Sequence, residues 1–271
     1  MPSEIRTGCI SWTYPDWLGP FYPKESKPAD YLRLYSSVFD IVEVDSTFYR
    51  SPNSTTVKQW KERTPENFLF TVKMPQKITH ILRLQNVDRE LEYFENTVKT
   101  LAGKLACFMT QLPPNMKFEK GYPALKQFLS VADKNKIRYA FEFRSESWLR
   151  DETYDLLKER DACLVWSVSG HVENLPPIVT TDFLYLRFMG EFKDLTKFDR
   201  VQKDRTALLE NWHGKLKDAI KSSHVERVYV LSSNHFAGFA PATTNQFRKI
   251  AGMDEKDWKE KMNLDSLGSL S

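Results

Sequence analysis

Short apolar runs alternate with longer segments of helical periodicity along most of this chain. Eight of these runs are rich in Val, Ile, Leu and Phe, and each predicts a buried strand. Runs of this length, bounded by turn residues, are typical of strands in a parallel sheet. They cover residues 5–10, 41–44, 68–73, 105–109, 138–143, 163–167, 183–188 and 227–231.

Apolar residues at helical spacing follow most of the strands. They predict helices over residues 30–38, 55–63, 88–101, 122–134, 151–160, 201–221 and 242–251. Residues 170–181, between the sixth and seventh strands, carry no such pattern. Eight strands with helical crossovers in about 250 residues match a closed (β/α)₈ barrel better than an open sheet. We therefore predict an α/β fold, a single TIM-barrel domain over residues 1–271, with its core at about 5–252 and a polar C-terminal tail.

Charged residues interrupt several strands at positions that face the barrel interior. Side chains alternate along a strand, so every second residue of each strand points inward. Functional groups of a TIM barrel gather where its strands end and the following loops begin. We therefore expect the inward charged residues to converge at one mouth of the barrel. The inward polar positions are Glu43, Asp45, Thr71, Lys73, Glu142, Arg144, Tyr185 and Arg187.

Two interpretations of this charged cluster remain open. Buried charges are costly unless they are paired, so a network is expected in either case. In the structural interpretation, pairs such as Glu43–Lys73 and Glu142–Arg187 only neutralise a polar interior. In the functional interpretation, the cluster forms a pocket for a small ligand, because arginine forks suit carboxylate or phosphate and carboxylates suit sugar hydroxyls.

The functional interpretation allows several chemistries. Glu43 and Glu142 form an acid–base pair as in glycoside hydrolysis if their carboxyl groups lie about 5–9 Å apart. Lys73 forms a Schiff base if it is desolvated and flanked by cations, although an inward lysine is more often an ion-pair partner. A metal held by Glu43, Glu142 and either His80 or His235 has little support, since HxH, HExxH and CxxC spacings are absent. We predict no metal site and leave the cofactor open.

Aromatic residues crowd the loops that we expect at the same mouth. They are explained by loop packing, or by a stacking platform for sugar rings or bases. A rim of Arg50, Lys73, Lys77, Arg83 and Arg144 keeps a nucleic-acid hypothesis open. Neither GxGxxG nor GxxxxGK[ST] occurs, so no phosphate-cradling glycine loop is predicted. The aromatic residues concerned are Trp12, Tyr14, Trp17, Phe21, Tyr22, Phe48, Tyr49, Trp148, Phe236 and Phe239.

The composition argues against some classes of protein but does not indicate a specific function. The formal net charge is +3 with 28% charged residues, so the overall balance does not argue for a nucleic-acid binder. Three cysteines lie far apart, which fits a reduced compartment. The N-terminus has no signal-peptide pattern, and no apolar stretch approaches the ~20 residues of a membrane span. We expect a soluble, cytoplasmic protein with no membrane partner, and leave its oligomeric state open.

Six strings occur in order along nearly the whole chain and carry a resemblance to a known family. They are GCISWTYPDWLGPFYP, VEVDSTFYRSPNSTTVKQWKERTPENFLFTVKMPQKITH, QLPP, FEFRSESWL, DFLYLRFMG and VYVLSSNHFAGFAPATTNQF. The chain thereby resembles the YecE-like family, domain of unknown function 72. The resemblance implies a TIM barrel and no established reaction. A relation to the barrels of metal-dependent apurinic endonucleases and sugar isomerases is an analogy of fold only.

These patterns together lead to a functional hypothesis. We expect an enzyme that acts on a small polar or anionic molecule through a charged pocket at the C-terminal mouth of the barrel. The alternative is a nucleic-acid-binding protein, endonuclease-like in one form, that uses the mouth aromatics and the basic rim; a non-catalytic scaffold is a third reading. The predicted catalytic residues are Glu43, Glu142 and Lys73. The predicted substrate-binding residues are Ser46, Thr47, Tyr49, His80, Arg144, Trp148, Arg187 and Asn234.

Overall fold

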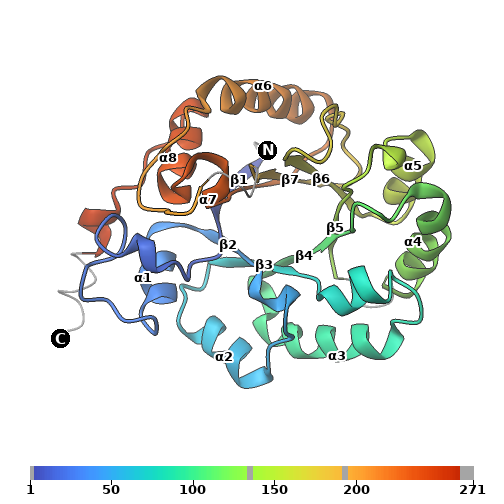
Figure 1. Cartoon of the computed structure of the whole chain (residues 1–271), viewed down its shortest axis with the longest axis horizontal. Helices are drawn as coiled ribbons and strands as arrows, with labels where there is room; N and C mark the ends of the chain where they lie inside the picture. Colours follow the sequence, from blue (N-terminus) through green and yellow to red (C-terminus); the bar gives the residue numbers. More distant parts are fainter. Residues whose placement is uncertain (1–2, 133–136, 191–194, 263–271) are drawn as a thin grey trace.

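The strands of the computed structural model, which describes residues 3–132, 137–190 and 195–262, close into a parallel barrel (Figure 1). Each strand pairs with its neighbours in chain order, and β8 returns to β1. The predicted TIM barrel is therefore confirmed. The strands are β1 (Glu4–Ile10), β2 (Ile41–Val44), β3 (Leu69–Lys73), β4 (Leu105–Gln111), β5 (Tyr139–Glu142), β6 (Cys163–Val168), β7 (Phe183–Phe188) and β8 (Arg227–Ser232).

Helices surround the strands on the outside of the barrel (Figure 1). Residues 169–182, which connect β6 to β7, form no helix, as the sequence pattern predicts. Within the described ranges, no helix has both the length and the apolar character needed to cross a membrane. The α-helices are α1 (Tyr31–Val38), α2 (Ser54–Glu62), α3 (Asp88–Val98), α4 (Phe118–Ala132), α5 (Asp151–Glu159), α6 (Thr206–Ser222), α7 (Asn234–Ala237) and α8 (Ala240–Ile250).

The structure corrects the predicted helices at several points. Helix α6 begins at Thr206 rather than at residue 201, because the preceding loop bonds elsewhere: the backbone N–H of Gln202 donates to the carbonyl of Ala237. Several short elements were not predicted, among them the four-residue α7 and a π-helical turn at Lys77–Ile81. Neither of these two is long enough for a periodic signal in sequence. The predicted end of the fourth helix, at residue 134, lies outside the described residues.

The core has two layers separated by the barrel wall. Between the strands and the helices, outward-facing residues such as Phe70, Phe108 and Leu186 pack against the helices. Inside the barrel a smaller apolar cluster includes Ile41 and Met109. The interior is apolar at the lower level of the barrel and polar where the strands end, so charged side chains gather at the carboxyl ends of the strands.

A close approach between β1 and β2 requires a glycine. A Cβ on Gly8 would lie 1.9 Å from the carbonyl oxygen of Ile41. The space is used by the Tyr35 hydroxyl, which donates to that carbonyl and accepts a hydrogen bond from the N–H of Cys9. Helix α1 is thereby fastened to the seam between the two strands, and the start of β2 is held in position.

The residues after α8 pack onto the barrel. The indole of Trp258 donates to the carbonyl oxygen of Pro20 at 3.0 Å and packs against Phe21. Met262 is buried. The C-terminal part of the chain therefore contributes apolar contacts beyond the predicted core limit at residue 252.

Candidate active site

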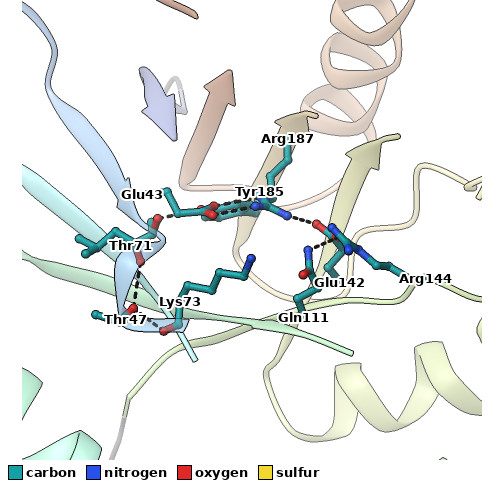
Figure 2. Close-up of polar contacts among 10 residues, drawn as sticks. Glu43, Thr47, Thr71, Lys73, Gln111, Glu142, Arg144, Tyr185 and Arg187 are labelled. Atoms are coloured by element: carbon teal, nitrogen blue, oxygen red, sulfur yellow. Dashed lines mark hydrogen bonds and ion pairs between the residues drawn. The ribbon is translucent and has the colours of Figure 1, made fainter. Parts of the chain in front are cut away.

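Arg187 is the centre of an ion-pair network inside the mouth of the barrel (Figure 2). It lies on β7, and its Nε and Nη2 donate to the two carboxylate oxygens of Glu43 on β2 at 2.9 and 2.7 Å. Its Nη1 donates to Glu142 on β5. The side chains of Arg187 and Glu43 are 0% exposed and that of Glu142 is 1% exposed. One guanidinium therefore joins three strands across the barrel.

Further hydrogen bonds saturate both carboxylates. The Tyr185 hydroxyl donates to Glu43 at 2.7 Å, and because that uses its one proton, Thr71 must donate to Tyr185. On the other side, Gln111 Nε2 and Arg144 Nε both donate to Glu142, at 2.7 and 2.9 Å. Each oxygen of the two carboxylates accepts at least one hydrogen bond. The network is complete without a ligand.

The protonation states of the network follow from these contacts. Burial alone would raise the pKa of Glu142, but Arg187 and Arg144 hold it well below its usual range. Burial would lower the pKa of Arg187, yet Glu142 and Glu43 hold it above the ordinary value. Burial raises the pKa of Tyr185, and the neighbouring Glu43 raises it further. The Glu142 carboxylate and the Arg187 guanidinium therefore stay charged, and the Tyr185 phenol stays protonated, at ordinary pH.

Lys73 lies in the same mouth but outside the network. In Figure 2 its amine extends toward the row formed by Glu43, Arg187 and Glu142, without a dashed line to any of them. Across the described residues, the only recorded contact of Nζ is with the ring of Phe48, whose centroid is 4.5 Å away. Burial, followed by the charge of Arg187, lowers the pKa of Lys73 to about 8.

Asp45 is the natural neighbour of Lys73. The register of β2 and β3 pairs Glu43 with Thr71 and Val44 with Val72. Asp45 then leaves β2 into the turn Ser46–Phe48, where the charge of Lys73 at the end of β3 acts on its carboxyl. Burial raises the pKa of the Asp45 carboxyl, and Glu43 raises it further. Within the described chain, its carboxylate makes no hydrogen bond or ion pair with another residue. Lys73 and Asp45 are thus two unpaired titratable groups at adjacent strand ends.

The charges of the two glutamates in the mouth are already balanced without Lys73. Arg187 and Arg144 are the cations that bond the two carboxylates Glu43 and Glu142. The ammonium of Lys73 is then an additional positive charge, and Asp45 is the adjacent group whose ionisation offsets it. The mouth is therefore suited to a negative ligand group or to a proton transfer between these two residues.

The predicted pairing of the charges is partly right. Glu142 does pair with Arg187. The predicted pair of Glu43 with Lys73 is wrong, because Glu43 is bonded by Arg187 instead. The reason is the register: Thr71, not Lys73, lies opposite Glu43, so Lys73 is one inward position closer to the mouth.

Three of the predicted substrate-binding residues form hydrogen bonds within the protein, through a hydroxyl, an indole N–H and an amide oxygen. The Thr47 hydroxyl donates to the carbonyls of Val44 and Lys73, which holds the turn Ser46–Phe48 on the end of β3. The Trp148 indole donates to the carbonyl of Met116 and its ring is fully buried. The side-chain oxygen of Asn234 accepts hydrogen bonds from the Trp17 indole and from a backbone N–H. These residues shape the loops around the site.

The remaining predicted binding residues lie toward the rim. Ser46 is exposed, and Tyr49 is 76% exposed with its ring against Phe48. His80 also packs on Phe48, and its Nδ1 lies 2.8 Å from the Thr79 hydroxyl. Burial, followed by the charge of Lys73, lowers the pKa of His80 to about 4. The imidazole is therefore neutral at physiological pH.

Several polar residues of the mouth were not among the predicted site residues. Gln111 ends β4 and bonds Glu142, and its inward parity could have found it. Ser167 pairs in register with Arg187 and so faces the same side, and its buried hydroxyl has no hydrogen-bond partner in the described part of the chain. The Tyr14 phenol lies near Asp45 and Asn234, a proximity between loops that no sequence pattern reveals; burial and the charge of Asp45 raise its pKa.

Most of the loop aromatics are buried and pack on one another. Trp17 contacts Phe21 and Tyr22 at ring-centroid distances of 5.3 and 5.9 Å. Trp12, Trp148, Phe236 and Phe239 are buried as well. Buried rings offer no face to a base or sugar, so the loop-packing interpretation describes these residues. Among the described His, Cys, Asp and Glu side chains, no group of three is arranged to hold a metal ion.

The sequence and the fold both match a family of proteins of unknown function. Residues 6–265 match the family described as "Protein of unknown function DUF72". The UPF0759 protein YunF of Bacillus subtilis (strain 168) is 31% identical over 157 residues, which are 56% of this chain and 54% of that protein. The UPF0759 protein YecE of Escherichia coli (strain K12) is 29% identical over 140 residues, 52% and 48% of the two chains. The chain spans about half the length of these curated relatives.

Solved structures carry the same likeness over nearly the whole barrel. A DUF72 family protein from Thermotoga maritima MSB8 aligns with a TM-score of 0.77 and 27% identity, covering 92% of this chain and 99% of the other. A DUF72 family protein from Enterococcus faecalis V583 aligns with a TM-score of 0.74 over 93% and 99%. Its identity of 20% makes this second likeness one of fold alone.

Removing the central cation is expected to destabilise the barrel strongly. In Arg187→Met, the carboxylates of Glu43 and Glu142 lose their shared partner while they remain buried. Breaking a buried ion pair from one side costs about 3–5 kcal/mol. Urea unfolding of the variant and the parent measures the loss. Arg144→Met, which removes a partly exposed cation from the edge of the network, should cost less, and equal losses would contradict the central role of Arg187.

Removing Lys73 is expected to have the opposite effect. Its folded-state pKa is lowered from 10.5 to about 8, so below pH 8 the folded protein carries a partly desolvated ammonium at a cost. Between about pH 8 and 10.5 the unfolded chain binds more protons, so stability rises with pH and this cost disappears. Lys73→Met should therefore raise the free energy of unfolding by about 1–3 kcal/mol at pH 7.

Urea unfolding at pH 7 and near pH 10 checks this expectation. The gain should shrink toward zero at the higher pH, where the parent amine is uncharged. A loss of stability at pH 7 would instead identify Lys73 as an ion-pair partner that the fold needs. Lys77→Met is the control: it removes an exposed lysine of the same segment and its surface ion pair with Glu90, which should change stability only slightly because surface ion pairs contribute little.

Proposed function

This chain belongs to the DUF72 family of unknown function, and since membership names no reaction, we propose from the site itself that it is an enzyme. It acts on a small polar or anionic molecule at the carboxyl ends of the barrel strands. Lys73 and Asp45 are the groups that exchange protons with the substrate. Arg187 and its two carboxylates form the rigid floor beneath them.

One observation carries this proposal: Lys73 and Asp45 are partly buried, lie close enough for the charge of Lys73 to act on Asp45, and are unpaired within the described chain, while the carboxylates of Glu43 and Glu142 are saturated. Their pKa values are shifted toward each other, that of Lys73 downward and that of Asp45 upward. Groups whose environments bring their pKa values toward neutrality are suited to general acid–base catalysis. Unpaired buried charges also reduce stability, and such a cost is typical of functional sites.

The saturated carboxylates are less suited to that role. Glu142 accepts hydrogen bonds on both oxygens, and its pKa is held low by two arginines. A carboxylate in this state is a poor proton donor at neutral pH. Glu43 is likewise bonded on both oxygens. In the proposal, therefore, Glu43 and Glu142 hold Arg187 in place. Asp45, and not either glutamate, is the catalytic carboxyl group that acts with Lys73.

An open cleft on the Arg144 side of the mouth supports a negatively charged substrate group. It has a volume of about 560 Å³ and is lined by Arg144, Lys117, His171 and the hydroxyls of Ser145 and Ser147, with Glu119 and Glu146 also on its wall. The Nε of Arg144 donates to Glu142, and the other two nitrogens of its guanidinium can donate to a ligand. A planar guanidinium next to a lysine and two hydroxyls suits a carboxylate or a phosphate group.

A ligand screen with matched variants tests the proposal. The purified protein is screened by ligand-observed NMR against pools of small carboxylates, phosphates and uncharged polyols. We expect anionic compounds to bind, and Lys73→Met to weaken that binding about tenfold or more by removing a desolvated charge. Asp45→Asn should abolish turnover of any compound that the parent converts.

The control is Lys77→Met, which removes an exposed lysine of the same segment and should leave binding unchanged. The proposal fails if Lys73→Met and Asp45→Asn bind and convert the same compounds as the parent. It also fails if the compounds that bind are uncharged and insensitive to Lys73.

A further inference from the structure

The chemical surroundings of the Lys73 amine suit more than proton transfer. Its Nζ makes no hydrogen bond or ion pair in the part of the chain that the structure describes, and the Phe48 ring covers one side of it. The side chain is still partly exposed, unlike that of Arg187, so a small molecule in the mouth can reach the nitrogen. An amine that is desolvated next to other cations is the environment in which lysines act as nucleophiles.

We infer that Lys73 forms a covalent imine with a small aldehyde or ketone that carries a carboxylate or phosphate group. The inference rests on the proposed function and names its substrate class. The carbonyl carbon would lie at Nζ, and the anionic group would lie in the cleft lined by Arg144 and Lys117. A carbonyl is required because the Lys73 amine is free to react, and an anionic group is required because Arg144 and Lys117 can still donate hydrogen bonds to a ligand.

The proton balance of this step uses Asp45. The uncharged amine attacks the carbonyl carbon, a C–N bond forms, and the carbonyl oxygen takes the proton of the Asp45 carboxyl. The Asp45 carboxylate then takes a proton from the nitrogen and passes it to the new hydroxyl group, which leaves as water. The nitrogen lone pair closes the C=N bond. The products are a protonated imine, an Asp45 carboxylate and one water.

The site accommodates the charge of that product. The protonated imine carries the positive charge where the ammonium stood, within reach of the charges of Glu43 and Glu142, and that positive charge also stabilises the new carboxylate of Asp45. The lowered pKa of Lys73, about 8, leaves roughly a tenth of the amine uncharged at pH 7, against a few parts in ten thousand for an ordinary lysine. Burial of Asp45 raises its pKa, which favours the protonated carboxyl that the first step needs.

Reductive trapping with glyoxylate, an anionic aldehyde, tests the inference. The folded protein is incubated with glyoxylate and sodium cyanoborohydride at pH 7, and carboxymethylated lysines are located by peptide mass spectrometry. Lys73 should be modified about tenfold or more faster than the exposed Lys77, which pairs with Glu90, because its lowered pKa leaves roughly a tenth of the Lys73 amine uncharged at pH 7. Propanal, which lacks the anionic group, should show a smaller preference for Lys73.

Variants separate a reactive site from general lysine chemistry. Lys73→Arg should remove the fast modification, and Lys77→Arg should leave it intact. Asp45→Asn should slow the modification of Lys73 while circular dichroism shows an unchanged fold. The inference is overturned if Lys73 is modified no faster than Lys77, or if Lys73→Arg retains the fast modification.

The trapping and ligand-binding experiments together show whether the imine hypothesis or the proposed acid–base function fails. If Lys73 is not trapped while Lys73→Met and Asp45→Asn still lose ligand binding and turnover, the imine is wrong and the acid–base role stands. If Lys73 is trapped while both variants bind and convert ligands like the parent, the amine is reactive and the proposed function is wrong.

Discussion

The guanidinium of Arg187 is the interaction on which the site depends. It is fully buried and bonds carboxylates from β2 and β5, so it fixes the relative positions of three strands at the mouth of the barrel. A buried cation of this kind is tolerated only because both carboxylates and their further donors compensate it. The fork geometry of arginine is essential, since one lysine could not bond both partners in this way.

The hydrogen bonds that saturate Glu43 and Glu142 determine the state of the neighbouring Lys73. Because Arg187, Arg144, Tyr185 and Gln111 occupy the carboxylate oxygens, the Lys73 amine has no hydrogen-bond or ion-pair partner among the described residues. Desolvation and the positive charges of the nearby arginines both lower the pKa of the Lys73 amine. The rigid network and the reactive amine are thus two parts of one electrostatic arrangement.

The barrel could be predicted from the sequence because its signals are local. Apolar runs, helical periodicity and alternation along strands identified the strands and the inward charges, including the Glu142–Arg187 pair. The Glu43–Lys73 pair was wrong because alternation tells which face a residue takes and not how far along the axis its neighbour lies. Loop residues such as Trp148 and Asn234 bond inside the protein, and no strand parity governs their orientation.

The ionisation of Lys73 is the most direct measure of this account. Protein labelled with ¹³C at the lysine Cε is titrated by NMR, and the Lys73 signal is assigned by its loss in Lys73→Arg. We expect that signal to titrate with a midpoint near pH 8, well below the ordinary lysine value of 10.5. A midpoint at or above the ordinary value would show that the amine is a stable charged partner of the carboxylates, and would contradict its role as the reactive group of the site.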